Sequence, residues 1–279
     1  MTPSAAAAGE LWLGGLHVRR MGFGAMRVCG PGVWGPPRER GAAQRVFRRA
    51  IELGVNFFDT ADSYGPHVDE ELIAEALHPY PEGLVIATKG GLVRPNRNAW
   101  DPDGRPEHLR HALEGSLRRL RLECIDLYQL HAPDPRVPFA DSVGALADMQ
   151  RAGKIRHIGV SNVSVEELEA ARRVATIVSV QNEYNLGERA SEDVLAACQQ
   201  LGIAFLPWYP LGAGALLRSG GVKKLAKRHG VSAAQVALAW LLARSPVMLP
   251  IPGTASLDHL EENVASAALR IPAEELASL

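Results

Sequence analysis

Short apolar segments rich in β-branched residues alternate along the chain with longer segments whose apolar residues recur at helical spacing. This alternation predicts repeated strand-helix units and therefore a parallel sheet. The segments with the character of buried strands are 20–25, 55–59, 84–88, 125–130, 155–160, 177–181, 204–207 and 247–249. The helical patterns that follow them are 40–53, 68–77, 106–120, 139–152, 164–173, 190–200, 232–243 and 256–268. Eight strands, each followed by a helix, predict an α/β fold of the (β/α)8 TIM-barrel type.

Turn residues support the boundaries of these elements. Pro106 stands where a helix is expected to begin, and its fixed φ suits the first helical turn. Gly54, Gly153 and Gly202 each follow a helical pattern, where a left-handed residue commonly ends the helix. Ahead of the first strand, the segment 11–19 with its central Gly-Gly pair predicts a β-hairpin placed to plug one end of the barrel.

The length and composition fit one barrel rather than several domains. The chain has 279 residues, of which 47% are hydrophobic and 22% charged, and a barrel of this type takes about 250 residues. We therefore expect a single domain over residues 1–279. Residues 1–10 are rich in alanine and lack the basic start of a signal peptide, so a flexible tail is expected there. No apolar run approaches the roughly 20 residues that span a bilayer, which favours a soluble protein.

Charge and cysteine content narrow the range of partners. The 30 basic and 31 acidic residues leave a formal net charge of −1, which gives no general attraction to nucleic acid or to a membrane surface. Cys29, Cys124 and Cys198 lie far apart and form no metal-binding spacing. They are expected to be reduced thiols in a cytoplasmic protein without a metal. The surface pattern indicates no strong interface, so a monomer or weak homo-oligomer is expected.

Four polar residues occur where barrel enzymes place their catalytic groups, at or just beyond the C-terminal ends of strands. Asp59, Lys89 and His131 directly follow the apolar cores of the second, third and fourth predicted strands, and Tyr64 lies in the loop after Asp59. Taken singly, each has an ordinary structural interpretation, but their joint placement on neighbouring strands favours catalysis. A lysine beside a tyrosine stabilises the phenolate and lowers the phenol pKa. The arrangement predicts Tyr64 as a proton donor usable near neutral pH, with His131 orienting a carbonyl oxygen.

These residues, beginning with the motif Asp-Thr-Ala-Asp-Ser-Tyr-Gly at 59–65, resemble the Asp-Tyr-Lys-His tetrad of the aldo-keto reductases. The resemblance continues in order through the segments 159–162, 181–182, 207–212, 251–254 and 261–263. Family members reduce aldehydes or ketones in a (β/α)8 barrel without a metal, using NADPH and less often NADH. The resemblance therefore implies NADPH-dependent reduction of a small carbonyl substrate, with Tyr64 as the proton donor.

The same resemblance implies a set of cofactor contacts. Ser161, Asn162 and Gln181 match positions that bind the nicotinamide carboxamide, and Trp208 matches an aromatic residue that stacks on the nicotinamide ring. The other implied cofactor-binding positions are Gly24, Met26, Asp59, Pro210, Leu211, Gly212, Arg218, Gly253, Thr254, Ser256, His259, Glu262 and Asn263.

One departure from the family pattern bears on the choice of cofactor. Many relatives have a lysine or arginine after the Pro-Gly pair to bind the 2′-phosphate of NADPH. This chain has Thr254, Ala255 and Ser256 there, with His259 one turn later. Charged donors bind phosphate most strongly, so their absence weakens the case for NADPH. Backbone N–H groups at a helix N-terminus can still hold phosphate, and NADPH remains the expected cofactor, with NADH as the alternative.

The loops resemble the branch of the family that includes bacterial pyridoxal reductases, also called pyridoxine 4-dehydrogenases. The matching segments are 22–26, 30–38, 64–68 and 180–185. Pyridoxal or another aromatic or cyclic carbonyl compound is therefore the leading expected substrate. On the loops, Trp34, Trp100 and Tyr209 are expected to form flat apolar walls of the substrate pocket.

Two other functions are compatible with the residues. Lys89 could act as a Schiff-base nucleophile in a barrel lyase, although that chemistry does not require Tyr64. Alternatively, the barrel could bind NADPH as a sensor or accessory subunit with little turnover.

Overall fold

The computed structural model describes residues 2–214 and 219–279. Its main feature is a curved sheet of seven parallel strands whose order in space follows their order in the chain. The strands are β3 (Phe23–Gly24), β4 (Phe57–Asp59), β5 (Val85–Gly90), β8 (Ile125–Leu130), β9 (Ile155–Ser161), β10 (Ile177–Glu183) and β11 (Ala204–Trp208).

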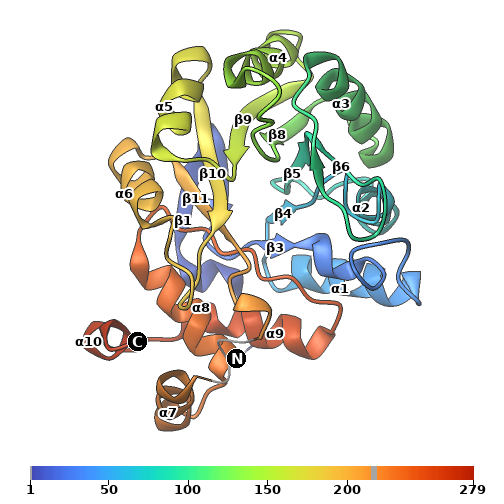
Figure 1. Ribbon diagram of the computed structural model, residues 1–279. Coiled ribbons are helices and arrows are strands. Elements are labelled where there is room, and N and C mark those ends of the chain that lie inside the picture. Colours follow the sequence, from blue (N-terminus) through green and yellow to red (C-terminus); the bar gives the residue numbers. More distant parts are fainter. Residues whose placement is uncertain (1, 215–218) are drawn as a thin grey trace.

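Helices surround this sheet, as Figure 1 shows in a view along the barrel. They are α1 (Arg40–Glu52), α2 (Val68–Leu77), α3 (Pro106–Leu120), α4 (Phe139–Arg151), α5 (Val165–Val174), α6 (Glu192–Leu201), α8 (Ala233–Arg244) and α9 (Leu257–Ala265). Two further helices, α7 (Gly220–His229) and α10 (Ala273–Ala277), lie outside this ring. Within the described residues, no helix is long and apolar enough to cross a membrane.

The barrel is closed by residues 247–250, which include the predicted eighth strand at 247–249. This segment forms only an isolated bridge, between Phe205 and Met248, rather than a regular strand. On one side, the Leu249 N–H donates to the Phe205 carbonyl at 2.9 Å. On the other side, the Gly22 N–H donates to the Pro250 carbonyl at 2.9 Å. The segment therefore connects β11 to the residue that precedes β3, the first strand of the barrel. The predicted TIM barrel is confirmed.

A β-hairpin covers one end of the barrel, as predicted. Its strands β1 (Glu10–Leu13) and β2 (Leu16–Arg19) are antiparallel. Leu13 and Leu16 are buried in one cluster with residues of the barrel interior, including Phe57 and Leu127. Because these apolar side chains continue the interior packing, the hairpin excludes water from this end.

The expected flexible tail is partly wrong. Residues Ala5–Ala8 form a short 3-10 helix, capped by the Ser4 hydroxyl, which accepts from the Ala6 N–H. Ala5 is fully buried, and its N–H donates to the Leu53 carbonyl at 2.9 Å. The small alanine side chains let this segment pack closely against the end of α1, which composition alone did not indicate.

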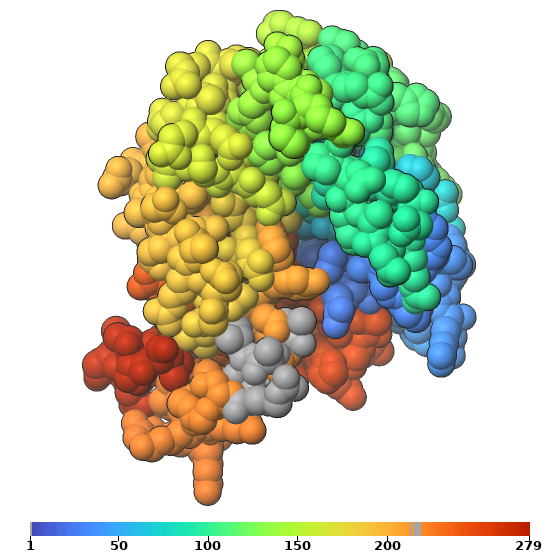
Figure 2. Space-filling model, in the orientation of Figure 1, coloured from blue at the N-terminus to red at the C-terminus, as the bar shows by residue number. Residues whose placement is uncertain are grey.

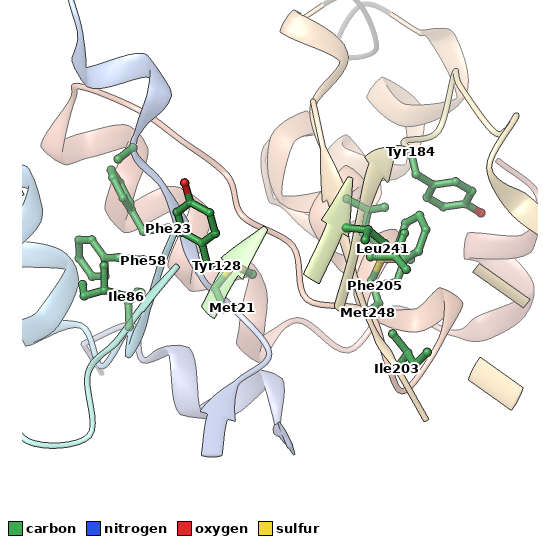
Figure 3. Packing of buried hydrophobic residues seen from close by; sticks show 14 of the residues in the cluster. Met21, Phe23, Phe58, Ile86, Tyr128, Tyr184, Ile203, Phe205, Leu241 and Met248 are labelled. Atoms are coloured by element: carbon green, nitrogen blue, oxygen red, sulfur yellow. The ribbon is translucent and has the colours of Figure 1, made fainter. Parts of the chain in front are cut away.

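A second apolar layer fills the space between the strands and the helices. Figure 3 shows two parts of it, one around Phe23 and Phe58 and the other around Tyr184 and Phe205. Phe57 points into the barrel while its neighbour Phe58 points outward, as the two-residue period of a strand requires. The parallel strands are thus buried on both faces.

The long loops contain short elements that the sequence pattern did not reveal. A 3-10 helix (Ala25–Val28) follows β3, and another (Gly212–Gly214) follows β11. A third (Ser266–Ala268) forms the end of the helical segment predicted over 256–268. A small antiparallel pair joins β6 (Leu92–Val93) to β7 (Asp101–Pro102) in the loop before α3. The elements after β3 and before α3 stiffen loops that line the mouth of the barrel.

Candidate active site

Strand alternation carries three polar side chains into one layer at the C-terminal end of the barrel interior. Residues 85 and 87 of β5 face inward, so the alternation of the strand also turns Lys89 inward. On β4, residue 57 faces inward, and Asp59 two residues later does so for the same reason. On β8, Leu127 faces inward and Gln129 follows it two residues later. Lys89 pairs in register with Gln129. The layer above the apolar core is therefore polar.

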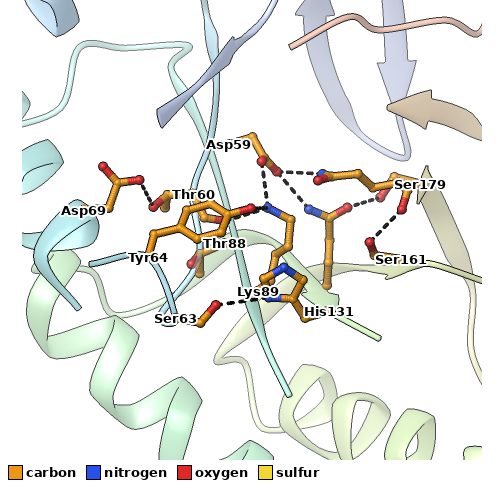
Figure 4. Close-up of polar contacts among 12 residues, drawn as sticks. Asp59, Thr60, Ser63, Tyr64, Asp69, Thr88, Lys89, His131, Ser161 and Ser179 are labelled. Carbon is orange, nitrogen blue, oxygen red and sulfur yellow. Dashed lines mark hydrogen bonds and ion pairs between the residues drawn. The ribbon is translucent and has the colours of Figure 1, made fainter. Parts of the chain in front are cut away.

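Lys89 holds this layer together. Its Nζ donates to Asp59 Oδ2 at 2.7 Å, to the Thr60 carbonyl at 2.9 Å and to the Tyr64 hydroxyl at 3.3 Å (Figure 4). The Lys89 side chain is fully buried, so the buried ammonium is balanced by a carboxylate and has three oxygen acceptors. The structure thus brings together the three residues predicted to act on a proton.

The pKa of Tyr64 differs from the sequence-based prediction. Burial has the largest effect and raises the pKa of the phenol to about 12, although the charge of Lys89 acts in the opposite direction. The negative charge of Asp59 also raises it. The predicted lowering is therefore wrong for the net shift, because desolvation of the phenolate outweighs its attraction to Lys89. Tyr64 is protonated at neutral pH, the form that a proton donor requires.

His131 stands beside Tyr64 at the end of β8. The two rings lie edge to face, with centroids 5.8 Å apart. The backbone N–H of His131 donates to the Gly90 carbonyl at 2.9 Å. The ring Nδ1 of His131 lies 3.4 Å from the Ser63 hydroxyl oxygen. Burial, followed by the charge of Lys89, holds the pKa of His131 well below its usual range. The imidazole is therefore neutral at physiological pH.

Two glutamines complete the polar layer around Asp59. Gln181 Nε2 donates to Asp59 Oδ1 at 2.8 Å, and Gln129 Nε2 donates to the same oxygen at 3.2 Å. Gln129 was missed in the sequence, although a polar residue at an inward position of an apolar strand is a usable signal. Gly159 leaves room for this layer, because a Cβ there would lie 2.2 Å from the Ser179 hydroxyl oxygen and 2.9 Å from Gln129 Cγ.

A cavity of about 550 Å³ opens directly above this layer. Tyr64 and His131 form part of its floor, and Trp100, Trp208 and Tyr209 form aromatic walls. Figure 2 shows a recess at the centre of this face of the molecule, between the green, blue and orange segments. The remaining lining residues are Met26, Arg27, Cys29, Gly30, Pro31, Gly32, Val33, Ser161, Asn162 and Gln181.

Two neighbouring cavities extend from this recess toward the start of α9, and together they form what we term the cofactor groove. The nearer one, of about 320 Å³, is lined by Tyr64, Trp208 and Gly253 among others. The farther one, of about 810 Å³, reaches the N-terminal turn of α9 at Ser256. The predicted cofactor positions that line the groove are Gly24, Met26, Asp59, Gln181, Trp208, Pro210, Leu211, Gly253, Thr254, Ser256, His259, Glu262 and Asn263.

Some predicted positions lie elsewhere. Trp34 does not line the cavity; its ring stacks on Arg94, and its backbone forms a bridge to Gly65. The loop folds back on itself here, a direction that residue type alone could not indicate. Gly212 is not among the lining residues of the groove. Arg218 lies outside the described residues.

Arg27 is a groove residue that the sequence analysis missed. It lines the recess and both cavities of the groove, and its stem lies over Gly253, where an added Cβ would be 3.5 Å from Arg27 Cγ. Its guanidinium forms no hydrogen bond or ion pair with any residue in the described part of the chain. Arg27 lies three residues after the segment Gly22-Phe23-Gly24, and this position was the available signal.

The backbone around the recess adopts conformations that are rare for residues other than glycine. Asn162, Tyr209 and Val33 have φ values of +59°, +51° and +55°. Such residues persist only where the surroundings determine them, and they concentrate at functional sites. Asn162 is fixed by a hydrogen bond to its Oδ1 from Trp208 Nε1 at 2.9 Å. This contact orients the indole at the junction of the recess and the groove.

The groove fits an extended dinucleotide better than it fits a metal. Gln181 uses its Nε2 on Asp59, while its Oε1 has no hydrogen-bond partner in the part of the chain that the structure describes. An amide of a ligand could donate to this oxygen. At the other end, the Ser256 hydroxyl accepts from the His259 N–H, and the N–H groups of Leu257 and Asp258 at the start of α9 point out of the first turn, where phosphate is favoured. Among the described residues, no three His, Cys, Asp or Glu side chains group as metal ligands.

A (β/α)8 barrel with a buried Asp-Lys-Tyr cluster beside a dinucleotide-shaped groove defines a nicotinamide-dependent oxidoreductase of the TIM-barrel class. The chain belongs to the Aldo/keto reductase family, which matches residues 20–279. This confirms the family inferred from the sequence motifs.

Known proteins resemble the chain over nearly its whole length. It is 50% identical to an uncharacterized oxidoreductase of Schizosaccharomyces pombe, over 99% of this chain and 90% of that protein. It is 45% identical to the pyridoxine 4-dehydrogenase of Escherichia coli, over 96% of each chain. The crystal structure of an aldo/keto reductase from Klebsiella pneumoniae in complex with NADP and acetate is similar with a TM-score of 0.81 and 29% identity. That likeness covers 94% of this chain and 90% of the other.

Proposed function

We propose that this protein reduces an aldehyde or ketone to an alcohol, with Tyr64 as the proton donor. The observation that carries this proposal is the buried contact of the Tyr64 hydroxyl with Lys89 Nζ at the floor of the recess. A nicotinamide cofactor bound in the groove supplies the hydride for this reaction. The protein's own task is to place the carbonyl oxygen near Tyr64 and to give it a proton.

The polar layer is suited to that task. Tyr64 donates its phenolic proton to the carbonyl oxygen as the alcohol forms, and the ammonium of Lys89 stabilises the phenolate left behind. Asp59 keeps Lys89 charged: burial lowers the pKa of the ammonium, but Asp59 and Tyr64 outweigh this and raise it overall. The neutral His131 beside Tyr64 can hydrogen-bond the same oxygen and fix its orientation.

NADPH is the proposed cofactor. The Klebsiella pneumoniae relative was crystallised with NADP, and Arg27 gives this groove a permanent positive charge despite the missing basic residue after the Pro-Gly pair. Thr254 and Ser256 hydroxyls and the first turn of α9 provide further donors near the far cavity. His259 lines the same cavity and adds a ring nitrogen.

An aromatic or cyclic carbonyl compound, with pyridoxal as the leading candidate, is the proposed substrate. Trp100, Trp208 and Tyr209 offer flat apolar faces around the floor of the recess. The similarity to the pyridoxine 4-dehydrogenase of Escherichia coli supports the same choice. Three free cysteines agree with a reducing compartment, and we propose a cytoplasmic monomer or weak homo-oligomer.

The alternative of a Schiff-base lyase is disfavoured by the state of Lys89. A Schiff-base lysine must be neutral and must reach the substrate. Lys89 is fully buried and paired with Asp59, and it is not among the residues that line the recess. A low-turnover sensor remains the second candidate, because such a protein would keep the same groove.

An assay of nicotinamide absorbance tests the proposal. Purified protein is mixed with NADPH and, in turn, pyridoxal, an aromatic aldehyde, a cyclic ketone and an aldose. We expect oxidation of NADPH with the aromatic aldehydes, and slower oxidation with NADH in its place. Tight NADPH binding without multiple turnover on any of these compounds would support the sensor, and preference for the aldose would contradict the proposed substrate class.

A further inference from the structure

Arg94 joins two loops at the edge of the recess. It follows β6 and is 9% exposed. Its guanidinium donates to the carbonyls of Val33 at 3.0 Å and Gly32 at 3.3 Å in one loop. It also donates to the carbonyls of Ala99 at 2.9 Å and Arg97 at 2.6 Å in the other. We term these segments, 29–35 and 94–100, the two wall loops, because both contribute lining residues to the recess.

The same guanidinium lies over the rings of two tryptophans, one from each wall loop. Its central carbon lies 3.6 Å from the centroid of the Trp100 ring and 5.3 Å from that of Trp34. Trp100 in turn meets Tyr64 edge to face, with ring centroids 6.2 Å apart. Cation-π contacts of this kind prefer arginine, whose planar head can stack and donate in its plane at the same time. Arg94 is thus in contact with the ring that lies beside Tyr64.

The wall loop 29–35 also needs an external support. Val33 has φ of +55°, a conformation that is unusual for a β-branched residue. Its carbonyl accepts from Arg94 and from the Gly65 N–H at 3.3 Å. These two hydrogen bonds hold the strained residue in place, and they connect it to the loop that carries Tyr64. Without Arg94, one of the two supports is lost.

We propose that Arg94 is a positioning residue that sets the shape of the substrate wall. Four of its five N–H donors are used on backbone carbonyls, and it is not among the lining residues of the recess. It is therefore poorly placed to bind a substrate carboxylate or phosphate directly, and it acts through Trp100 and the wall loop 29–35. This inference rests on the proposed function, because it concerns the substrate of that reaction.

The test compares Arg94→Met, which keeps the length of the side chain, with Arg94→Lys, which keeps the charge. Arg45→Met serves as the control, since Arg45 is an exposed residue of α1 away from the recess. For an aromatic aldehyde we expect KM to rise about tenfold in both Arg94 variants, with kcat at saturation within about threefold and the Kd of NADPH unchanged. For a small aliphatic aldehyde that does not reach Trp100, KM should rise much less in the Arg94 variants.

Hydrogen exchange separates this inference from the proposed reaction. Amides of both wall loops should exchange faster in Arg94→Met than in the wild type and in Arg45→Met, whether or not any carbonyl compound is turned over. Unchanged exchange in the wall loops would overturn the positioning role. Absence of turnover in the wild type, with the exchange difference intact, would instead count against the proposed function.

A double-mutant cycle with Trp100→Ala locates the effect. If Arg94 acts through Trp100, the double variant should have about the same KM as Trp100→Ala alone. Additive effects would overturn that route, as would a parallel loss of kcat, substrate affinity and NADPH affinity in Arg94→Lys.

Discussion

At the scale of residues, the site depends on one buried cation and the groups arranged around it. Lys89 contacts Asp59 and Tyr64, and the pKa of Tyr64 reflects a competition between burial and this cation. Burial prevails, so the phenol stays protonated until strongly alkaline pH. The same burial keeps His131 neutral. The resting site therefore holds the proton that carbonyl reduction consumes.

This protonation state predicts different pH dependences for the two directions of the reaction. Reduction needs protonated Tyr64, whose pKa is about 12, so its chemical step should be flat across neutral pH and decline only as the pH rises toward that value. Alcohol oxidation needs the phenolate. As long as the pH is below the pKa, its rate should rise about tenfold for each unit by which the pH increases. Primary isotope effects identify the chemical step in each profile, measured with deuterated reduced cofactor for reduction and with alcohol deuterated at the reacting carbon for oxidation.

Lys89→Met is the matching variant for this prediction. It removes the charge that lowers the pKa of Tyr64 and stabilises the phenolate formed in reduction, so it should slow the chemical step in both directions. A reduction rate that titrates near pH 6.5, while the isotope effect remains large, would contradict both the protonated Tyr64 and the neutral His131.

The residues of the site were not equally predictable. Asp59, Lys89 and His131 could be placed from the sequence, because a polar residue at the end of an apolar strand has a defined position in a barrel. Trp34 was placed wrongly and Arg27 was missed, because both belong to a loop whose course depends on contacts far away in the chain. Arg94 shows the same limit, since its partners Gly32 and Val33 lie 62 and 61 residues earlier in the chain.

At the scale of elements, the two-residue and helical periods predicted most strands and helices to within a few residues. The eighth strand is the exception among the strands: residues 247–250 make the closing hydrogen bonds but only one bridge. Helix α7 was missed because it begins with two glycines, although its buried Val222, Leu225 and Ala226 have helical spacing. The two glycines argued against a helix there, although the apolar residues had the spacing of one.

The hairpin gives a prediction at this scale. Gly14→Ala should destabilise the protein, because φ is +58° there and the new Cβ would lie 2.5 Å from the His157 ring. Moving that ring would also break its hydrogen bond from the Gly15 N–H. Gly83→Ala is the control, since φ is +77° but no atom lies within 4 Å of its Cβ.

Both variants carry the cost of a left-handed alanine, so their difference isolates the contact with His157. We expect Gly14→Ala to lose about 1–2 kcal/mol more in the free energy of unfolding than Gly83→Ala, measured by urea denaturation. Equal losses would show that the hairpin tip is not packed on β9 as described.

At the scale of the whole molecule, the barrel divides its ends between stability and chemistry. The hairpin and apolar interior close one end, whereas the polar layer, the recess and the cofactor groove occupy the other. Trp208 lines the recess and the nearer cavity of the groove, and Arg27 lines the recess and both cavities as far as the start of α9. The architecture and family could be predicted from the sequence, but the continuous course of the groove required the folded chain.

The most direct test of the proposed reaction is the single-turnover rate of NADPH oxidation by an aromatic aldehyde in Tyr64→Phe. Tyr80→Phe is the control, because the Tyr80 hydroxyl donates to the Leu120 carbonyl far from the recess. We expect the Tyr64 variant to lose at least about a hundredfold in rate, since it lacks the general acid, while its Kd for NADPH stays within about twofold. A Tyr64→Phe protein that keeps most of the wild-type rate would contradict Tyr64 as the proton donor.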